Sequence, residues 1–278
     1  MKQKSRTTRT VKTILIYFAV IGGGILYLFP IIWSVLASFK HMVDTFCIPP
    51  RFIFSPTLNN YISVIQTKHF FSHMLNSIVV CSFSTLIALL LGSLAAYSLS
   101  RCRIPAKENI AFWILSLRMG PPIAFIIPFY ILFQKAGLVD TYWVLIIMYT
   151  FMNLPFSVWM MRSFIEGIPV SIEESAMIDG CSRLSVFLRI TLPLSKPGLC
   201  ATAFFSLIFA WNEFLYALIL TYKNVVTVPV KAASLVAYRG ILWNELGAVS
   251  VLSILPIVLF TFFIRRHLVS GLTFGAIR

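Results

Sequence analysis

The segment EESAMIDGCSRLSVFLRITLPLSKP, residues 173–197, decides how the chain is interpreted, because it is charged and helix-forming within a largely apolar sequence. Just before it, Pro169 interrupts the chain, and Ser171 with Glu174 three residues later has the spacing of a helix-capping box. Gly180 is a natural helix stop, since a left-handed backbone carries no steric penalty for glycine. A second helix is expected from about residue 182 until LPLSKPG ends it. The segment therefore predicts a helix, a turn and a second helix at a membrane surface.

The composition indicates a membrane protein. The 278 residues are 59% hydrophobic and only 12% charged, and the mean hydropathy is +0.88. These values lie far from those of soluble globular domains. The net charge of +14 would suit nucleic acid, but cations on a membrane protein normally mark cytosolic loops, so no nucleic-acid partner is expected.

Six apolar runs are long enough to cross a bilayer as helices. They are residues 13–37, 74–99, 110–133, 142–161, 198–220 and 247–264. Backbone groups have no water to bond in lipid, so each span is expected to be helical. The predicted fold class is therefore an all-α integral membrane protein with six transmembrane helices.

The distribution of cations predicts the orientation. With a cytosolic N-terminus, fifteen Lys and Arg lie in inside segments and seven in outside segments, with Arg118 left in a span. This bias agrees with the positive-inside rule, so both termini are expected in the cytosol. The predicted organisation is a basic cytosolic N-terminus at 1–12, a transmembrane domain at 13–264 and a cytosolic tail at 265–278. External segments are expected at 38–73 and 221–246, and the cytosolic segment at 166–197.

Sites for catalysis, metals and nucleotides are not expected in this chain. The sequence offers no nucleophile, base and orienter in a recognisable spacing, and no metal-ligand cluster. The glycine run at 22–24 lacks the Lys and Ser/Thr of a phosphate loop. A secondary transporter, an ion channel or a membrane-embedded enzyme remain as alternatives with the same composition. For residues 173–197 themselves, the plain alternative is a connector between two spans.

The cytosolic segment resembles the signature of the inner-membrane permease subunits of binding-protein-dependent ABC importers, in the carbohydrate branch that includes maltose, glycerol-phosphate and alginate systems. The matching positions are Glu174, Ser175, Ala176, Asp179, Gly180, Ile190, Leu192 and Pro193. Ser175 and Cys181 replace alanines of the family pattern with other small residues. RMGPPIAFIIPFY, GLVDTYWVLIIMY, LPFSVWMMRSF, FAWNEFLYALILT and GLTFGAIR are similar to the same branch, in the same order.

The resemblance implies a type I importer permease of a bacterial inner membrane, working by alternating access and importing oligosaccharides or related sugars. It implies a homologous second permease, a dimer of ATPase subunits that uses ATP and Mg, and a periplasmic or lipid-anchored solute-binding protein. The signature would be the coupling helix that docks on the ATPase, through Glu173, Glu174, Ser175, Ala176, Asp179, Gly180 and Cys181. For Glu174 the alternative role is that of the capping-box acid. The tail GLTFGAIR would also reach the ATPase, or would be unstructured.

Polar and aromatic residues within the spans predict the substrate path, because such groups are costly in lipid and normally face a cavity or a partner. The candidates are Arg118, Tyr149, Asn153, Trp211, Asn212, Glu213 and Tyr216. For Arg118 and Glu213, an equally weighted alternative is an ion pair, formed either with each other or with another subunit. For Tyr149 and Trp211, the alternative role is packing in the protein core. Segment 221–246 resembles a loop that reaches the binding protein, with an ordinary linker as the alternative.

Overall fold

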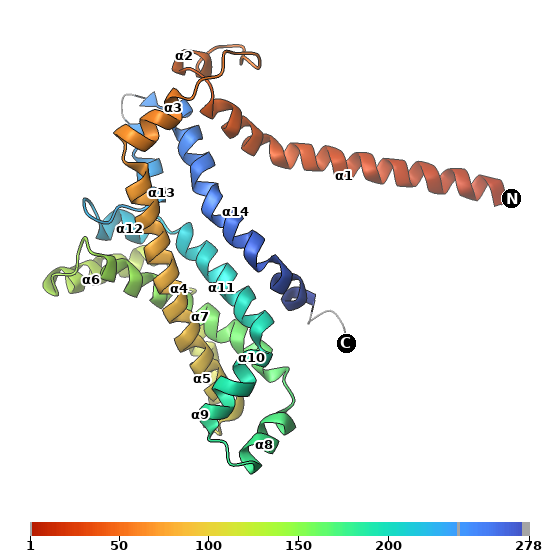
Figure 1. Cartoon of the computed structure of the whole chain (residues 1–278), viewed down its shortest axis with the longest axis vertical. Helices are drawn as coiled ribbons and strands as arrows, with labels where there is room; N and C mark the ends of the chain where they lie inside the picture. Colours follow the sequence, from red (N-terminus) through yellow and green to blue (C-terminus); the bar gives the residue numbers. More distant parts are fainter. Residues whose placement is uncertain (1, 238–239, 274–278) are drawn as a thin grey trace. The chain divides into compact units, whose positions relative to one another are not determined.

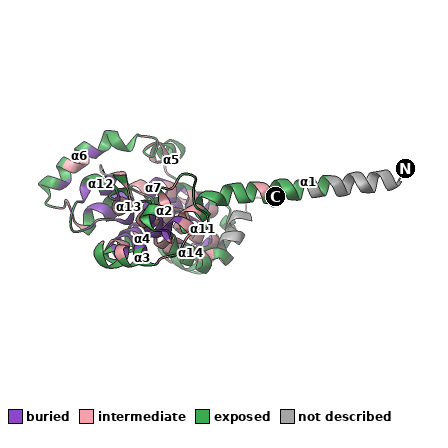
Figure 2. Cartoon of the chain, turned by 90° about the horizontal axis from the view of Figure 1, so that it is seen from above, coloured by how far each residue is buried: buried purple, intermediate pink, exposed green. Residues whose placement is uncertain are grey.

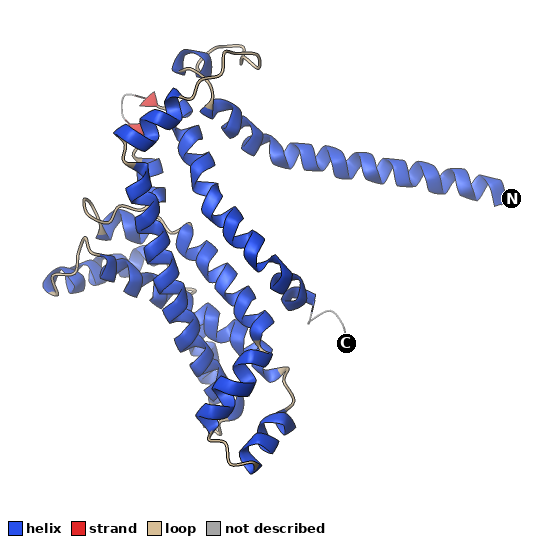
Figure 3. Cartoon of the chain, in the orientation of Figure 1, coloured by secondary structure: helices blue, strands red, loops and turns tan. Residues whose placement is uncertain are grey.

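Helices form nearly all of the secondary structure in the computed structural model, which describes residues 2–237 and 240–273 (Figure 3). The chain divides into two compact units, one of Met1–His69 with Leu235–Ile254 and one of Phe70–Ser234 with Leu255–Arg278. The long helix α14 (Trp243–Thr273) begins in the first unit and ends in the second. Residues 274–278 of the predicted tail lie outside the described residues.

The first unit is built around α1 and the beginning of α14. Its other elements are short: α1 (Lys2–Ser38), α2 (Met42–Thr45), α3 (Asn59–Ile62), the π-helical turn η1 (Ser63–Thr67) and the hairpin of β1 (Val236–Ala237) and β2 (Gly240–Ile241). Figure 2 shows that the described side chains of α1 are mostly exposed, as expected of an apolar helix that meets lipid or another chain. Gly247 lets α14 approach α1 closely, since a Cβ there would lie 2.8 Å from the backbone oxygen of Ser34.

The second unit contains a bundle in which α4, α7 and α11 run alongside one another (Figure 1). Its helices are α4 (Phe70–Arg101), α5 (Lys107–Ser116), α6 (Pro122–Lys135), α7 (Tyr142–Glu166), α8 (Val170–Ile178), α9 (Arg183–Val186), the π-helical η2 (Phe187–Thr191), α10 (Leu192–Leu194), α11 (Lys196–Trp211), α12 (Leu215–Leu220) and α13 (Val228–Ala233). Ala88, Gly92 and Ala96 form a buried stripe of small residues along α4. Small residues permit close backbone approach where no hydrophobic effect drives helices together in lipid.

Four of the six predicted spans are confirmed as helices long and apolar enough to cross a membrane. These are Leu15–Ser38, Phe70–Arg101, Tyr142–Glu166 and Trp243–Arg265. Among the described residues there is a fifth candidate span if two helical segments are counted as one. These are Arg183–Leu194 and Lys196–Trp211, which meet at a bend of 77°.

The runs predicted as spans over 110–133 and 198–220 are each divided into two helices by a break. In the first, Pro121 adopts extended backbone and Pro122 starts α6, so the helical hydrogen-bond ladder stops at the prolines. In the second, α11 ends at Trp211, and the side chain of Glu213 accepts a hydrogen bond from the backbone N–H of Tyr216 at 2.9 Å. Such side-chain caps compete with a continuous helix.

Candidate functional site

Two regions of the second unit contain the predicted site residues: the surface helix α8 and a pocket at the two helix breaks. The turn after α8 confirms the predicted stop, since Gly180 has φ of +91°. The second helix also starts as predicted, where Ser182 accepts a hydrogen bond from the backbone N–H of Ser185 at 3.3 Å. The predicted capping box is wrong. Pro169 precedes the first turn of α8, and Ser171 lies inside the helix without capping it.

The two neighbouring acids of α8 lie on different faces. Glu173 is 1% exposed, and its Oε1 accepts hydrogen bonds from Arg101 Nε and Thr191 Oγ1, both at 3.0 Å. Arg101 also donates to the backbone oxygens of Ile165, at 2.8 Å, and Ile168, at 2.7 Å. This cluster fastens α8 to the ends of α4 and α7.

The opposite face of α8 is free of the bundle. Glu174 is exposed and lies one helical turn before Ile178, which is 86% exposed, so both project from one face. Of the other predicted coupling residues, Ser175, Asp179 and Gly180 are exposed, and Ala176 and Cys181 are half-buried. An exposed isoleucine beside a carboxylate gives this face of α8 a mixed apolar and acidic character.

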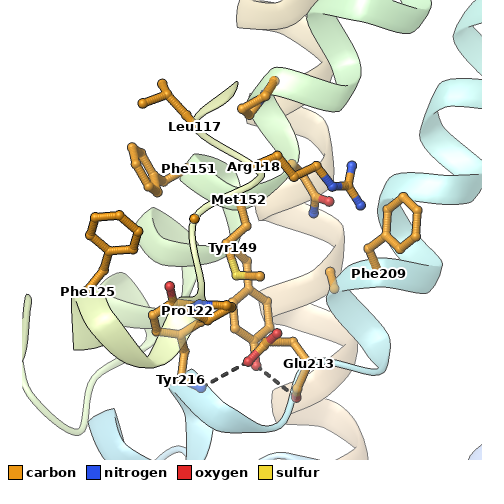
Figure 4. A pocket seen from close by; sticks show the side chains of 14 residues that line it. Leu117, Arg118, Pro122, Phe125, Tyr149, Phe151, Met152, Phe209, Glu213 and Tyr216 are labelled. Carbon is orange, nitrogen blue, oxygen red and sulfur yellow. Dashed lines mark hydrogen bonds between the residues drawn. The ribbon is translucent and has the colours of Figure 1, made fainter. Parts of the chain in front are cut away.

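The pocket gathers five of the seven predicted path residues: Arg118, Tyr149, Asn153, Glu213 and Tyr216. Its volume is about 80 Å³. Figure 4 shows Arg118 at one end beside Phe209, Glu213 at the other beside Tyr216, and Tyr149 between them. Both charged residues lie in the helix breaks. The backbone at both breaks lines the cavity.

Arg118 and Glu213 do not form the mutual ion pair that was one alternative. Within the described part of the chain, the guanidinium of Arg118 lies over the rings of Phe209, at 4.2 Å, and Phe156, at 5.1 Å. Cation–π contact of this kind stabilises a guanidinium without neutralising it. The charge of Arg118 therefore stays available to a partner or a ligand.

The other two path candidates lie elsewhere. Trp211 is buried and belongs to the core cluster that also contains Tyr216 and Leu220, which agrees with its packing alternative. Asn212 follows the last residue of α11, and its side-chain amide donates to the backbone oxygen of Ile208 at 2.9 Å. Tyr149 is also a core residue, although its hydroxyl reaches the backbone oxygen of Glu213 at 3.3 Å. The aromatic residues Phe209 and Phe125 line the pocket but were not predicted, because apolar rings in a span carry no distinguishing signal.

Asp140 fixes the start of the predicted external segment 221–246. Its Oδ1 accepts hydrogen bonds from the backbone N–H groups of Tyr222, Lys223, Asn224 and Val225, at 3.1 to 3.4 Å. Burial raises the pKa of the Asp140 carboxyl, but the four backbone donors together outweigh it, so the pKa lies below the ordinary value of an aspartate. Nearby, Asn76 donates to the backbone oxygen of Val226 at 3.1 Å.

We expect Asp140→Asn to lower stability by about 2 kcal/mol near neutral pH, because the carboxylate accepts several charge-assisted hydrogen bonds. Since folding lowers this pKa, the contribution is fully present above about pH 4 and is lost as the pH falls through the lower folded value. The unfolding temperatures of wild type and Asp140→Asn should therefore differ at pH 7, and the difference should shrink as the pH falls below about 4. A constant difference between the two proteins across this range would contradict the assignment.

Comparisons with known proteins agree with this architecture. Residues 88–274 match the family described as binding-protein-dependent transport system inner membrane component. The chain is 38% identical over 280 residues to the probable ABC transporter permease protein y4oR of Sinorhizobium fredii, covering 100% of both chains. It is 37% identical to the trehalose/maltose transport system permease protein MalG of Thermococcus litoralis, covering 96% of this chain and 98% of that one.

A solved structure has the same fold. It is a chain of a bacterial ABC transporter involved in the import of the acidic polysaccharide alginate, with a TM-score of 0.77 and 24% sequence identity. The match covers 94% of this chain and 98% of that chain.

Proposed function

Because the chain belongs to the family of binding-protein-dependent transport system inner membrane components, we propose that it is one permease subunit of an ATP-driven importer of oligosaccharides or related sugars. Relatives named for trehalose/maltose and for diacetylchitobiose transport support the sugar class. The observation that carries the mechanism is α8, a helix fastened to the bundle through Glu173 while its other face presents Glu174 and Ile178.

The proposed topology has six spans with both termini in the cytosol of a bacterium and the protein in its inner membrane. The third span would consist of α5 and α6, and the fifth of α11 and α12, each interrupted at a pocket residue. Broken helices at a midplane site are a recurrent feature of transporters, where freed backbone groups and polar side chains line the path.

In this proposal α8 is the coupling helix that docks on a separate ATPase subunit, which binds ATP and Mg itself. Glu174 and Ile178 would contact the ATPase, and Asp179 and Gly180 would lie at the edge of the contact. The Arg101 and Glu173 pair would then transmit displacement of α8 to α4. Movement transmitted through a packed, fully bonded cluster is rigid-body movement, as alternating access requires.

The substrate would pass along Arg118, Asn153, Glu213 and Tyr216. A volume of about 80 Å³ is well below the roughly 300 to 1,000 Å³ of ligand pockets. This chain would therefore supply half of the path, and a homologous second permease the other half. Segment 221–246, fixed at its start by Asp140, would face an external solute-binding protein, either periplasmic or lipid-anchored.

The experiment is to co-express the chain with its neighbouring permease, ATPase and binding-protein genes and to purify the complex. ATP hydrolysis in proteoliposomes is then measured with trehalose, maltose, chitobiose and alginate oligomers, with and without the binding protein. We expect one sugar to stimulate hydrolysis several-fold only when the binding protein is present. An ATPase that never co-purifies, or hydrolysis that no sugar changes, would contradict the proposal.

A further inference from the structure

Lys40 is a buried cation in the first unit for which the described residues offer no carboxylate. It lies two residues beyond the apolar helix Leu15–Ser38 and is 1% exposed. Its Nζ is over the ring of Trp33 at 4.3 Å and over that of Phe54 at 5.2 Å. Aromatic faces offset part of the desolvation of an ammonium but leave its full charge in place.

Both acidic residues of this unit already bind other cations. Asp44 pairs with Arg51 at 3.0 Å. Glu245 pairs with Lys68 at 3.8 Å and accepts a hydrogen bond from Ser63 at 2.8 Å. The sequence of the unit contains no further Asp or Glu, so any counter-charge for Lys40 comes from outside the unit.

Lys40 lines a cavity of about 250 Å³ between the end of α1 and the beginning of α14. The wall combines two tryptophans with hydroxyl groups: Trp33, Trp243, Ser34, Thr45 and Ser250. Empty cavities in proteins are typically apolar, whereas a cavity with a charged and hydroxylated wall holds water or a ligand. Tryptophans are enriched where the hydrocarbon core meets the head groups.

The backbone of Lys40 is held in place before any ligand arrives. Asn60 Nδ2 donates to the backbone oxygens of Ser38 and Lys40, both at 2.8 Å. Asn244 in turn donates to Asn60 Oδ1 at 2.8 Å, which ties the cluster to α14. The backbone that carries Lys40 is therefore fixed, whereas its flexible four-carbon stem lets the ammonium turn towards the cavity.

We propose that this cavity binds the phosphate diester of a phospholipid head group. A phosphate at the membrane boundary supplies the counter-charge that Lys40 lacks, and its oxygens accept charge-assisted hydrogen bonds from an ammonium. The surrounding loop agrees with contact to lipid. Ile48 and Ile53 are almost completely exposed, Phe52 is largely exposed and Trp243 is about half exposed, so this surface presents apolar groups next to the cavity.

The test is binding of dioctanoyl phosphatidylglycerol to the detergent-purified complex containing the full chain, with dioctanoyl glycerol and inorganic phosphate as the comparison ligands. Lys40→Met, which keeps the apolar stem, should weaken binding of the phospholipid about tenfold or more. Lys223→Met removes an exposed lysine of the other unit and should leave binding unchanged. Ser250→Met fills the cavity without removing the charge and should also weaken binding, which keeps the proposal testable if Lys40→Met does not fold.

Equal binding by wild type and both cavity variants would overturn the proposal and would mean that the rings alone hold the ammonium. Binding of dioctanoyl glycerol as tight as that of the phospholipid would exclude the phosphate as the recognised group. Binding of inorganic phosphate that depends on Lys40 and matches the phospholipid in affinity would contradict the assignment to lipid.

Discussion

Arg101→Met is expected to destabilise the protein by about 3 to 5 kcal/mol, because removing one partner of a buried ion pair leaves an uncompensated buried charge. The Arg101 side chain is 8% exposed and that of Glu173 is 2% exposed. The change also leaves the backbone oxygens of Ile165 and Ile168 without this donor. Thermal unfolding, followed by exposure of the buried Cys81 thiol to a fluorogenic maleimide, should shift by about 10 °C.

The double variant Arg101→Met/Glu173→Met separates the charge effect from general damage. Replacing both members of a buried ion pair by apolar groups is often nearly neutral, so the double variant should be more stable than Arg101→Met alone. If Arg101→Met unfolded at the wild-type temperature, the ion pair of Arg101 and Glu173 would not stabilise the contact between α8 and α4. Additive losses in the double variant would show that the two side chains do not interact.

The second large effect is expected for Gly92→Val, at the contact of α4 with α7. A Cβ at Gly92 would lie 2.6 Å from Ser157 Cβ and 3.2 Å from the backbone nitrogen of Val158. Backbone atoms in a packed helix cannot move aside cheaply, so we expect a loss of about 3 kcal/mol, with Gly92→Ala intermediate. Thermal unfolding, followed by maleimide labelling of Cys81, measures this loss of stability.

Gly23→Val in α1 is the matched control for Gly92→Val. A Cβ at Gly23 meets nothing within 4 Å, and valine has a somewhat higher helix propensity than glycine. The control should therefore unfold at or slightly above the wild-type temperature. Equal losses at the two glycines would indicate a general intolerance of β-branched residues and would remove the argument for close packing at Gly92.

The long apolar runs were predictable from sequence because a helix that spans lipid needs about 20 apolar residues and little else. The breaks in the third and fifth runs lie at short polar or proline-containing signals. Gly120, Pro121 and Pro122 are consecutive, and Asn212 with Glu213 supplies both a helix end and a cap. A hydropathy average taken over about 20 residues hides such short polar groups. In this protein the same groups line the pocket.

Contacts between distant parts of the chain explain the remaining differences. Glu173 and Glu174 are chemically alike, and only the packing of α8 against Arg101, 72 residues earlier, separates their positions. The hydrogen bonds of Asp140 to residues 222–225 have no local sequence pattern, since the carboxylate and its donors are more than 80 residues apart. Sequence periodicity therefore predicted the helices better than the faces they bury.

The most direct test of the account measures two properties of complexes that carry Glu174→Lys. One is the binding of the purified ATPase subunit, and the other is ATP hydrolysis stimulated by the sugar. We expect docking about 30-fold weaker, or about 2 kcal/mol, because a charge is reversed within the proposed contact. Glu108→Lys is the control, since it reverses another exposed carboxylate and leaves Arg162 paired with Glu166 at 2.7 Å. Loss of stimulation in Glu174→Lys but not in Glu108→Lys is the result we predict. Wild-type stimulation in Glu174→Lys would mean that the exposed face of α8 does not dock on the ATPase and would contradict the account.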